Sequence, residues 1–266
     1  VNMFRQRGSI AAVVRVISFG LPTAEEAHIP PEVMQVANMK KGIVLVTGAA
    51  GSGKSTTLAC IINQINHSRS GHILTLEDPV EYIHRHGQCI ISQREIHIDC
   101  PSYVAALRSA LRESPDVILL GEMRDRETME VAMTAAETGQ LLLSSLHTTG
   151  AANTIDRIID AFPPNQQSQI RLQLSMVLQA VISQQLVPGV DGQPIPAFEI
   201  MYTTMAIRNM IRESKTHLLE SAIASGGAMG MRTMDMALTE LVTQGKITKE
   251  AALTHCVNYE TMKNRL

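Results

Sequence analysis

Short apolar runs alternate with longer amphipathic stretches through the first half of the chain. The runs are aliphatic or β-branched and are bounded by Gly or polar residues, which predicts buried strands. They cover residues 42–47, 72–76, 89–92, 117–120 and 141–145. Between them, apolar side chains recur at helical spacing, which predicts helices from Ser55 onward, at Tyr103–Glu113 and at Asp125–Glu137. Strands and helices that alternate in this way form a mostly parallel, covered sheet, so the pattern predicts an α/β fold.

The second half of the chain is mainly helical in pattern. Helices are expected at Asn153–Ala161, Gln166–Leu186, Met205–Arg212, His217–Ala224, Met234–Gln244 and Lys249–Cys256, with one further strand at Ile195–Met201. Pro163 and Pro164 separate the first two helices, because a helix interior does not tolerate Pro.

The N-terminal segment follows a different pattern. An alternating apolar run within Val1–Ile17 predicts one or two strands, and nothing nearby is expected to pair with them. We therefore expect this segment to close a sheet formed by residues outside the sequence. Phe19–Pro31 is polar and contains Pro, which is typical of a linker, and Glu32–Asn38 is a candidate short helix.

Composition narrows the class of protein. The chain has 266 residues, of which 45% are hydrophobic, which is ordinary for a globular protein with a sizeable core. Only 3% are aromatic, Trp is absent and Met occurs 15 times, so the core is expected to be aliphatic and adaptable. The formal net charge of −2 does not favour a general nucleic-acid binder, so no nucleic acid is expected as a partner.

The cysteines favour neither disulfides nor zinc. Cys60, Cys89, Cys100 and Cys256 form no C-x-x-C pair and have no spacing typical of zinc ligands. A reducing, cytoplasmic location is the simplest explanation. No apolar run approaches the ~20 residues that a membrane-spanning helix needs.

A phosphate-binding loop is the most specific feature of the sequence. Gly48–Ser55 fits G-x-x-x-x-G-K-[ST], with a predicted strand before it and a predicted helix after it. In this motif the backbone N–H groups and the helix N-terminus bind phosphate, the Lys reaches the β- and γ-phosphates, and the Ser hydroxyl binds Mg²⁺. The expected nucleotide-binding residues are Gly48, Ala49, Ala50, Gly51, Ser52, Gly53, Lys54, Ser55 and Thr56. The sequence therefore predicts a protein that binds a nucleoside triphosphate; the alternative is a Gly-rich turn that precedes a helix.

Acidic residues follow two of the predicted strands. Glu77, Asp78 and Glu81 come after the second strand, and catalytic groups of open α/β sheets lie at the carboxyl ends of strands. A solvated loop is the alternative for this cluster. Glu122 follows four apolar residues, which is the second half of the P-loop NTPase signature, where an acid lies near the metal and the attacking water.

His147 is a further candidate for the site. It follows the strand at 141–145 and precedes Thr148 and Thr149, so its ring could sense a γ-phosphate by hydrogen bonding. A lone His is as often a satisfied structural group, and the residues alone leave both roles open.

The order of these motifs is similar to that of the secretion-type hexameric ATPases, and within them to the ATPases of type IV pilus retraction (twitching motility). The resemblance rests on the phosphate-binding loop and on the strings Thr75–Tyr82, Pro115–Asp125, Leu146–Thr149, Thr154–Asp160 and Ala206–Glu213. The last string resembles the C-terminal signature tied to retraction. Pilus-extension and type II secretion relatives carry paired C-x-x-C motifs that this chain lacks, which favours retraction.

The resemblance implies an α/β fold with a RecA-like P-loop NTPase core at residues 39–214 and a helical C-terminal region at 215–266. Residues 1–20 would be the end of a PAS-like N-terminal domain, and 21–38 a linker. Ala49 and Ala50 replace a Pro-Thr pair of the family, and Gln140 replaces a His, so His147 is the matching histidine. Arg5 and Arg7 remain as candidates for the arginines that the N-terminal domain supplies to a neighbour's nucleotide.

The resemblance also implies a function, that of an ATP-hydrolysing motor with ATP and Mg²⁺ as cofactors. Glu122 and Glu81 would organise the metal and the attacking water, with Ser55 and Glu122 as metal ligands and His147 as the reporter of the γ-phosphate. Arg112 and Arg124 are candidates for charge stabilisation, within a subunit or across a subunit boundary, or are surface salt-bridge residues.

The expected partners are further copies of the chain in a homohexamer, an inner-membrane pilus platform protein and a second pilus ATPase. The expected location is the cytoplasm, at the inner face of the cytoplasmic membrane. Two other functions stay open at this point: a non-hydrolysing, nucleotide-dependent pilus assembly factor, and a DNA-translocating ring ATPase.

Overall fold

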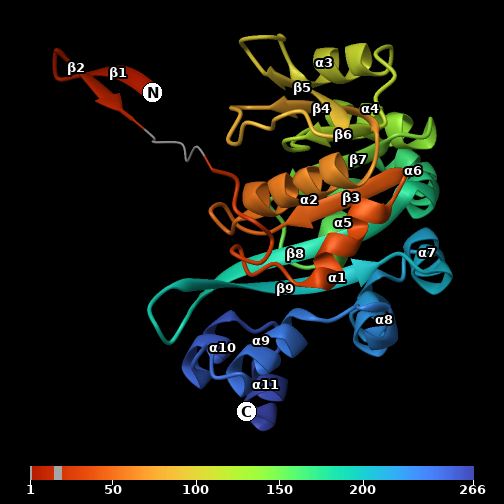
Figure 1. Ribbon diagram of the computed structural model, residues 1–266. Helices are drawn as coiled ribbons and strands as arrows, with labels where there is room; N and C mark the ends of the chain where they lie inside the picture. Colours follow the sequence, from red (N-terminus) through yellow and green to blue (C-terminus); the bar gives the residue numbers. More distant parts are fainter. Residues whose placement is uncertain (1, 15–19) are drawn as a thin grey trace.

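The computed structural model describes residues 2–14 and 20–266 of the chain. Within these residues, seven strands form one sheet in the spatial order β5-β4-β6-β7-β3-β8-β9 (Figure 1). The strands are β3 Gly42–Thr47, β4 Gly71–Glu77, β5 Cys89–Glu95, β6 Val117–Leu120, β7 Leu141–Leu146, β8 Leu178–Pro188 and β9 Pro194–Tyr202. Neighbours from β5 to β8 run parallel, and the pair β8–β9 is antiparallel. The predicted α/β class with a mostly parallel sheet is confirmed.

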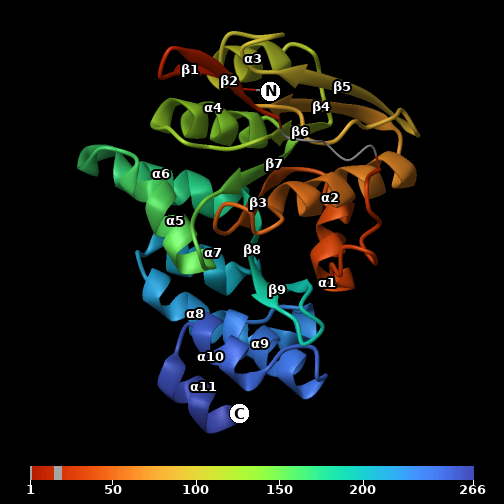
Figure 2. The same cartoon turned by 90° about the vertical axis from the view of Figure 1, so that its left-hand side faces the viewer.

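Helices cover both faces of this sheet (Figures 1 and 2). They are α1 Pro31–Met34, α2 Lys54–Ser68, α3 Tyr103–Ala110, α4 Arg126–Glu137, α5 Ala151–Asp160, α6 Pro164–Val177, α7 Met205–Arg212, α8 Leu219–Ser225, α9 Met234–Thr243, α10 Lys249–His255 and α11 Tyr259–Arg265. Ile43 and Leu45 of β3 pack with the cluster that contains α3 to α8, whereas Val44 and Val46 pack with α1 and α2. A strand covered on both faces is apolar throughout, which is why β3 lacks alternation. Among the described residues, no helix combines the length and apolar character needed to span a bilayer.

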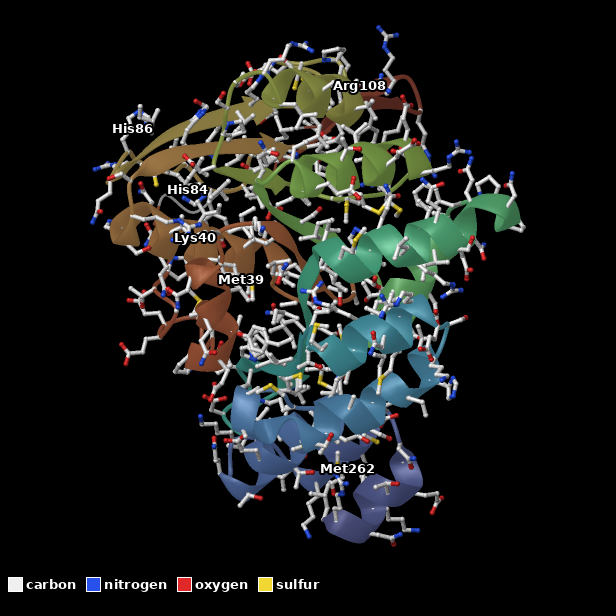
Figure 3. All side chains as sticks on the ribbon, turned by 90° about the vertical axis from the view of Figure 1, so that its right-hand side faces the viewer. Met39, Lys40, His84, His86, Arg108 and Met262 are labelled. Carbon is white, nitrogen blue, oxygen red and sulfur yellow. The ribbon has the colours of Figure 1, made fainter. Side chains whose placement is uncertain are left out.

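The C-terminal helices have a small core of their own. It joins α9, α10 and α11 to the far ends of β8 and β9 and contains Val187, Ala197, Met234, Leu238, Ile247, Ala252 and Met262. Figure 3 shows Met262 near one end of the molecule and Arg108 of α3 at the opposite end. The sheet therefore lies between two helical ends.

The predicted helix at Gln166–Leu186 is wrong in its second half. The helix α6 ends at Val177, and the following residues form β8, which pairs with β3 on one side and β9 on the other. This run contains β-branched Val181 and Ile182, which suit a strand buried between two others, and tertiary pairing overrides the helical spacing. The difference matters because Gln184 of β8 lies beside the phosphate-binding loop.

The N-terminal strands are paired locally, contrary to the expectation. β1 Asn2–Gln6 and β2 Ser9–Val13 form an antiparallel hairpin of their own. Arg7 and Gly8 make the turn with φ of 47° and 80°, as a two-residue hairpin loop with positive φ requires. Arg5 and Arg7 are exposed on this hairpin. The end of the predicted run, residues 15–17, lies outside the described residues.

Two helix predictions need smaller corrections. α3 ends at Ala110 rather than at Glu113, because Pro115 and the positive φ of 50° at Ser114 prevent the helix from continuing. Arg112 therefore lies in an exposed turn instead of on a helix. The last helix, α11, was not expected at all.

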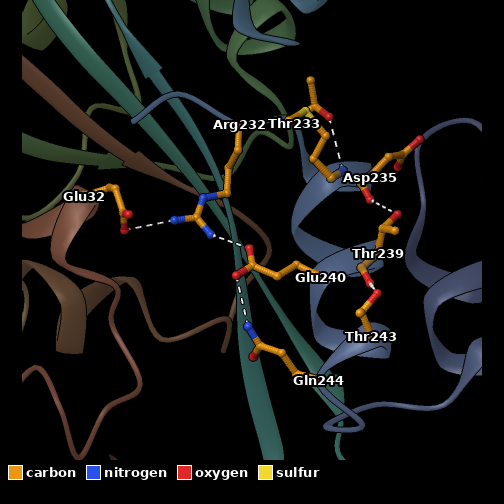
Figure 4. Close-up of polar contacts among 9 residues, drawn as sticks. Glu32, Arg232, Thr233, Asp235, Thr239, Glu240, Thr243 and Gln244 are labelled. Carbon is orange, nitrogen blue, oxygen red and sulfur yellow. Dashed lines mark hydrogen bonds and ion pairs between the residues drawn. The ribbon is translucent and has the colours of Figure 1, made fainter. Parts of the chain in front are cut away.

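The segment before β3 is fixed to the C-terminal helices through one arginine. Arg232 donates hydrogen bonds to Glu32 at 2.9 Å and to Glu240 of α9 at 3.0 Å (Figure 4). The Tyr202 hydroxyl of β9 also donates to the backbone carbonyl of Glu32. Residues 21–38, expected as a linker, thus pack against the sheet, with Val33 fully buried.

Candidate active site

Four neighbouring strands end at one cleft. The carboxyl ends of β3, β4, β6 and β7 lead into the phosphate-binding loop, Glu77, Glu122 and His147, respectively. The cleft has a volume of about 350 Å³. It is lined by Ala50, Gly51, Lys54, Ser55, Glu77, Asp78, Pro79, Glu81, Tyr103, Gly121, Glu122, Arg124, Ser145 and His147. Ligands of open α/β sheets bind at such an edge, so this is the candidate site.

The phosphate-binding loop has the backbone that its glycines allow. Gly48 and Gly53 have φ of 144° and 88°, and a Cβ on Gly48 would lie 2.2 Å from the backbone carbonyl of Gln184. The loop is joined to β7 by the Gly48 N–H, which donates to Leu146 O at 3.2 Å. α2 begins at Lys54 with no side-chain cap, so its first N–H groups face the loop. This geometry is that of an anion-binding helix N-terminus.

Lys54 folds back over the loop. Its Nζ donates to Gly48 O at 2.9 Å and to Ala49 O at 2.8 Å, and it lies 3.5 Å from His147 Nδ1. Burial lowers the pKa of Lys54, while Glu122 and Glu81 act in the opposite direction. The loop thus holds one ammonium group in a partly desolvated position, where its charge acts strongly on a bound anion.

The Glu122 carboxylate contacts both the Arg124 guanidinium and the His147 imidazole in the cleft. Its Oε1 lies 2.6 Å from Arg124 Nε, and its Oε2 lies 3.3 Å from His147 Nε2. The Glu122 side chain is only 11% exposed, whereas that of Arg124 is 72% exposed. Since His147 also contacts Lys54, one chain of contacts runs from the loop lysine to Arg124.

Ser145 holds the backbone on both sides of Glu122, which lies just after β6. Its hydroxyl donates to Gly121 O at 2.6 Å, and its carbonyl accepts the Met123 N–H at 3.2 Å. Glu122 is therefore held between two anchored neighbours. The motifs of the sequence do not identify Ser145 as a site residue; the available signal is a Ser at the end of an apolar strand.

Glu77 is a half-buried carboxyl group that also lines the cleft. Thr75 Oγ1 donates to it at 2.6 Å and Gln93 Nε2 at 3.3 Å. Burial raises the pKa of Glu77, although these hydrogen bonds act to lower it. Tyr103 also lines the cleft, and burial raises the pKa of its hydroxyl, with Glu122 adding to the effect.

The loop that carries Glu81 is held by α2 and β5. The Thr56 and Tyr82 hydroxyls lie 2.8 Å apart, and Gln93 Nε2 of β5 donates to Tyr82 O at 2.9 Å. Buried Asn66 of α2 accepts the Gly87 N–H at 3.0 Å and the Cys89 N–H at 3.2 Å. The position of Glu81 therefore depends on the helix that follows the phosphate-binding loop.

Most of the residues predicted for the site come together, and Arg112 does not. Ala50, Gly51, Lys54 and Ser55 line the cleft with Glu81, Glu122, Arg124 and His147, while Gly48, Ala49, Ser52 and Gly53 complete the loop and Thr56 lies in the first turn of α2. Arg112 does not line the cleft. A role for Arg112 stays a prediction, for the nucleotide of a neighbouring subunit.

The site could hold Mg²⁺ only if a bound phosphate ligand supplied some of the oxygens around the ion. In residues 2–14 and 20–266, no group of three or more His, Cys, Asp or Glu is arranged to hold a metal ion. Ser55 and Glu122 line the same cleft and offer a hydroxyl and a carboxylate oxygen. Mg²⁺ is commonly bound by one or two such oxygens, with substrate phosphates and waters as its other ligands. The residues present fit that arrangement.

A known protein family matches most of the chain. The model of the type II/IV secretion system protein family matches residues 14–255. The chain belongs to this family. Within the secretion system family, it is 49% identical over 252 residues to the type IV pilus retraction ATPase PilT of Pseudomonas aeruginosa, covering 95% of this chain and 73% of that protein. It is also 49% identical over 263 residues to a twitching motility protein of Neisseria gonorrhoeae, covering 98% of this chain and 70% of that protein.

A solved structure of a pilus retraction motor has the same fold. A crystal structure of the pilus retraction motor PilT with bound ADP superposes with a TM-score of 0.93 at 45% identity, covering 98% of this chain and 75% of that one. The predicted resemblance to pilus retraction ATPases is therefore confirmed.

Proposed function

We propose that this chain is an ATP-hydrolysing subunit of a homohexameric motor that powers type IV pilus retraction. The observation that carries the proposal is the contact chain in which His147 lies within 3.5 Å of both Lys54 and Glu122. These contacts join the phosphate-binding loop to Glu122, the acid that follows β6. In addition, relatives at 49% identity are named a pilus retraction ATPase and a twitching motility protein.

Binding of ATP would use the loop and its lysine. The triphosphate would accept hydrogen bonds from the amides of residues 48–56. The Lys54 ammonium, which contacts two loop carbonyls, would bind the β- and γ-phosphates. When bound, Mg²⁺ would offset the negative charge that develops on the phosphates during hydrolysis. Ser55 and Glu122 would hold it.

Hydrolysis would require an oriented water molecule. Glu81 and Glu122 face the same cleft from two different strand ends, so either carboxylate can accept a proton from water or orient it. His147, hydrogen-bonded to Glu122, would respond to the γ-phosphate on one side and to the acid on the other. Phosphoryl transfer depends on such positioning and on charge more than on covalent chemistry.

A ring would complete the site. Arg124 is largely exposed and Arg112 lies in an exposed turn, so either could act on a nucleotide at a subunit boundary, where an arginine supplied in trans raises rates by roughly 10³–10⁵-fold. We propose residues 39–214 as the ATPase core and 215–266 as the helical region that moves with hydrolysis. The proposed partners are an inner-membrane pilus platform protein and a second pilus ATPase, with the motor at the cytoplasmic face of the membrane.

The test of this function is release of inorganic phosphate from Mg·ATP, measured against protein concentration. Wild type should hydrolyse ATP, with a specific rate that rises as subunits associate. Glu122→Gln and Glu81→Gln should each lower kcat by roughly 10²-fold or more. Glu137→Gln, an exposed acid at the end of α4, is the control and should keep the wild-type rate.

The same assay separates the alternatives. Binding of ATP without phosphate release at any protein concentration would favour the non-hydrolysing assembly factor. Turnover that depends on added DNA would favour the translocating ring. Either result would contradict the proposed function.

A further inference from the structure

One buried carboxylate contacts the starts of two helices that lie far apart in the sequence. Glu199 lies on β9 and is 7% exposed. Its Oε1 accepts the Ala151 N–H at 2.7 Å, and its Oε2 accepts the Met234 N–H at 3.4 Å. Ala151 is the first residue of α5 and Met234 the first residue of α9. Glu199 thus links the helix after His147 with the C-terminal helices.

The first residue of α5, Ala151, lies only four residues after His147 of the active site. Gly150 is the N-cap of α5 and provides no side-chain cap. Its N–H donates to Ser183 Oγ at 2.8 Å, and Ser183 is the cross-strand partner of Glu199. Together, Ser183 and Glu199 hold the backbone at Gly150 and Ala151. Because His147 begins this short turn, its ring position depends on that hold.

The α9 side reaches the rest of the C-terminal region. The Thr233 side chain caps α9 by accepting the Met236 N–H, which leaves the Met234 N–H to Glu199. α9 also carries Glu240, which pairs with Arg232 (Figure 4). A change at the start of α9 is therefore passed to a helix that packs on β9 and is joined through Arg232 to Glu32 of the segment before β3.

The charge of Glu199 is offset mainly by these two helix starts. Burial raises the pKa of Glu199, Glu220 and Asp235 raise it further, and the N–H groups of Ala151 and Met234 lower it. Among the described residues, no Lys, Arg or His forms an ion pair with Glu199. A carboxylate near a helix N-terminus is stabilised by the helix dipole. Because one carboxylate serves both helices, weakening either contact alters the other.

We propose that Glu199 is a positioning residue that couples the His147 turn to the C-terminal helices. Movement of His147 when the γ-phosphate leaves shifts the start of α5, changes the hold of Glu199 and so changes the hold on α9. This inference rests on the proposed function, because it assigns the coupling to steps of ATP turnover.

The test is hydrogen–deuterium exchange of the full chain with Mg·ADP and with a non-hydrolysable Mg·ATP analogue. In wild type, peptides that cover the starts of α5 and α9 should change their exchange together between the two nucleotides. In Glu199→Gln, the change at α9 should be lost, while the change at the His147 turn remains. The same variant should lower kcat by about five- to tenfold with KM for ATP unchanged, since a coupling rather than a binding contact is removed.

Two further variants keep the outcome decisive. Glu220→Gln removes a nearby exposed charge that contacts neither helix start, and it should behave as wild type. Ser183→Ala loosens only the α5 side and should reduce the response at α9 in part. An α9 response in Glu199→Gln equal to that of wild type, or no α9 response in wild type, would overturn the proposal. Hydrogen–deuterium exchange with Mg·ADP can be measured even if the protein does not hydrolyse ATP. Failure of the coupling proposal can therefore be told apart from failure of the proposed function, which phosphate release tests.

Discussion

The guanidinium of Arg124 lies 2.6 Å from a carboxylate oxygen of Glu122, although only Glu122 is shielded from solvent. This hydrogen bond is the largest cause of the raised pKa of Arg124. The exposed arginine thus extends from the acid at the base of the cleft toward its rim. A residue in this position can act on the nucleotide of its own subunit or of a neighbour.

Loss of the Arg124 guanidinium should impair hydrolysis more than binding. Arg124→Ala is expected to lower kcat by roughly 10- to 100-fold, because Glu122 loses its closest cation and the phosphates lose a stabilising charge. Arg124→Lys should restore only part of the rate, since an ammonium lacks the planar donor set. Phosphate release and nucleotide binding are measured in parallel. Arg108→Ala is the control, because it changes an exposed arginine of α3 that pairs with Glu127 of α4. An unchanged kcat in Arg124→Ala would exclude this role.

Asn66 should matter for both stability and turnover, because it holds the loop that carries Glu81. Asn66→Ala removes the acceptor for two backbone N–H groups and the donor to Arg85 O at 2.9 Å. Of these partners the Cys89 N–H is buried, and leaving it unpaired costs about 1–3 kcal/mol of unfolding free energy, which lowers Tm by about 3–10 °C. The ATPase rate should fall as well. Gln64→Ala, at an exposed position of α2, should change neither quantity, and an equal effect of both variants would argue against the assignment.

We expect the unfolding free energy to fall in mild acid because of His84. Burial lowers the pKa of His84 from 6.5 to about 4. The unfolded chain therefore binds this proton first, and the stability that neutral His84 contributes is present above pH 6.5 and lost as the pH falls toward 4. The expected loss is roughly 3 kcal/mol.

Denaturant titrations between pH 7 and pH 4 check the role of His84. In His84→Gln, the decline of unfolding free energy over this range should be smaller than in wild type. His67→Gln, which changes an exposed histidine of α2, should leave the decline as it is. Parallel curves for wild type and His84→Gln would show that another group is responsible.

Arg208 stabilises the fold, although it belongs to Ala206–Glu213, the string that resembles a retraction signature. Its guanidinium donates to Ser175 O at 2.5 Å and Met176 O at 2.7 Å, at the carboxyl end of α6. Arg208→Ala should cost about 2–3 kcal/mol of unfolding free energy, because the helix end loses charged hydrogen bonds. Arg212→Ala, at an exposed site on the same helix, should cost little. Chemical denaturation compares the two variants, and similar costs would refute this division of roles.

The sequence was sufficient for the parts of the molecule that local patterns control. β3 agrees with the predicted strand because a parallel strand covered on both faces is an uninterrupted apolar run. The phosphate-binding loop, Glu81, Glu122 and His147 could be placed at one edge, because the ends of parallel strands meet there.

Other features depend on pairing that no local pattern contains. The spacing of residues 178–186 predicts a helix, but this run forms β8 because pairing with β3 and β9 outweighs the spacing. Asn66, Gln93 and Glu199 gain their roles from backbone groups of distant elements, so nothing near them in the sequence identifies them. The end of α3 differs from these cases, because Pro115 is a local signal that the helix stops before Glu113 and that Arg112 lies in a turn.

The central claim is that the loop and its lysine bind the phosphates of Mg·ATP beside two acids. Isothermal titration calorimetry with a non-hydrolysable Mg·ATP analogue tests it most directly. Wild type and Lys41→Ala, which changes an exposed lysine before β3, should show saturable binding, and Lys54→Ala should bind at least about tenfold more weakly, since a charge-assisted hydrogen bond contributes about 1.5–3 kcal/mol. Heat of binding that is absent in wild type at millimolar nucleotide, or equal in Lys54→Ala and wild type, would contradict the account.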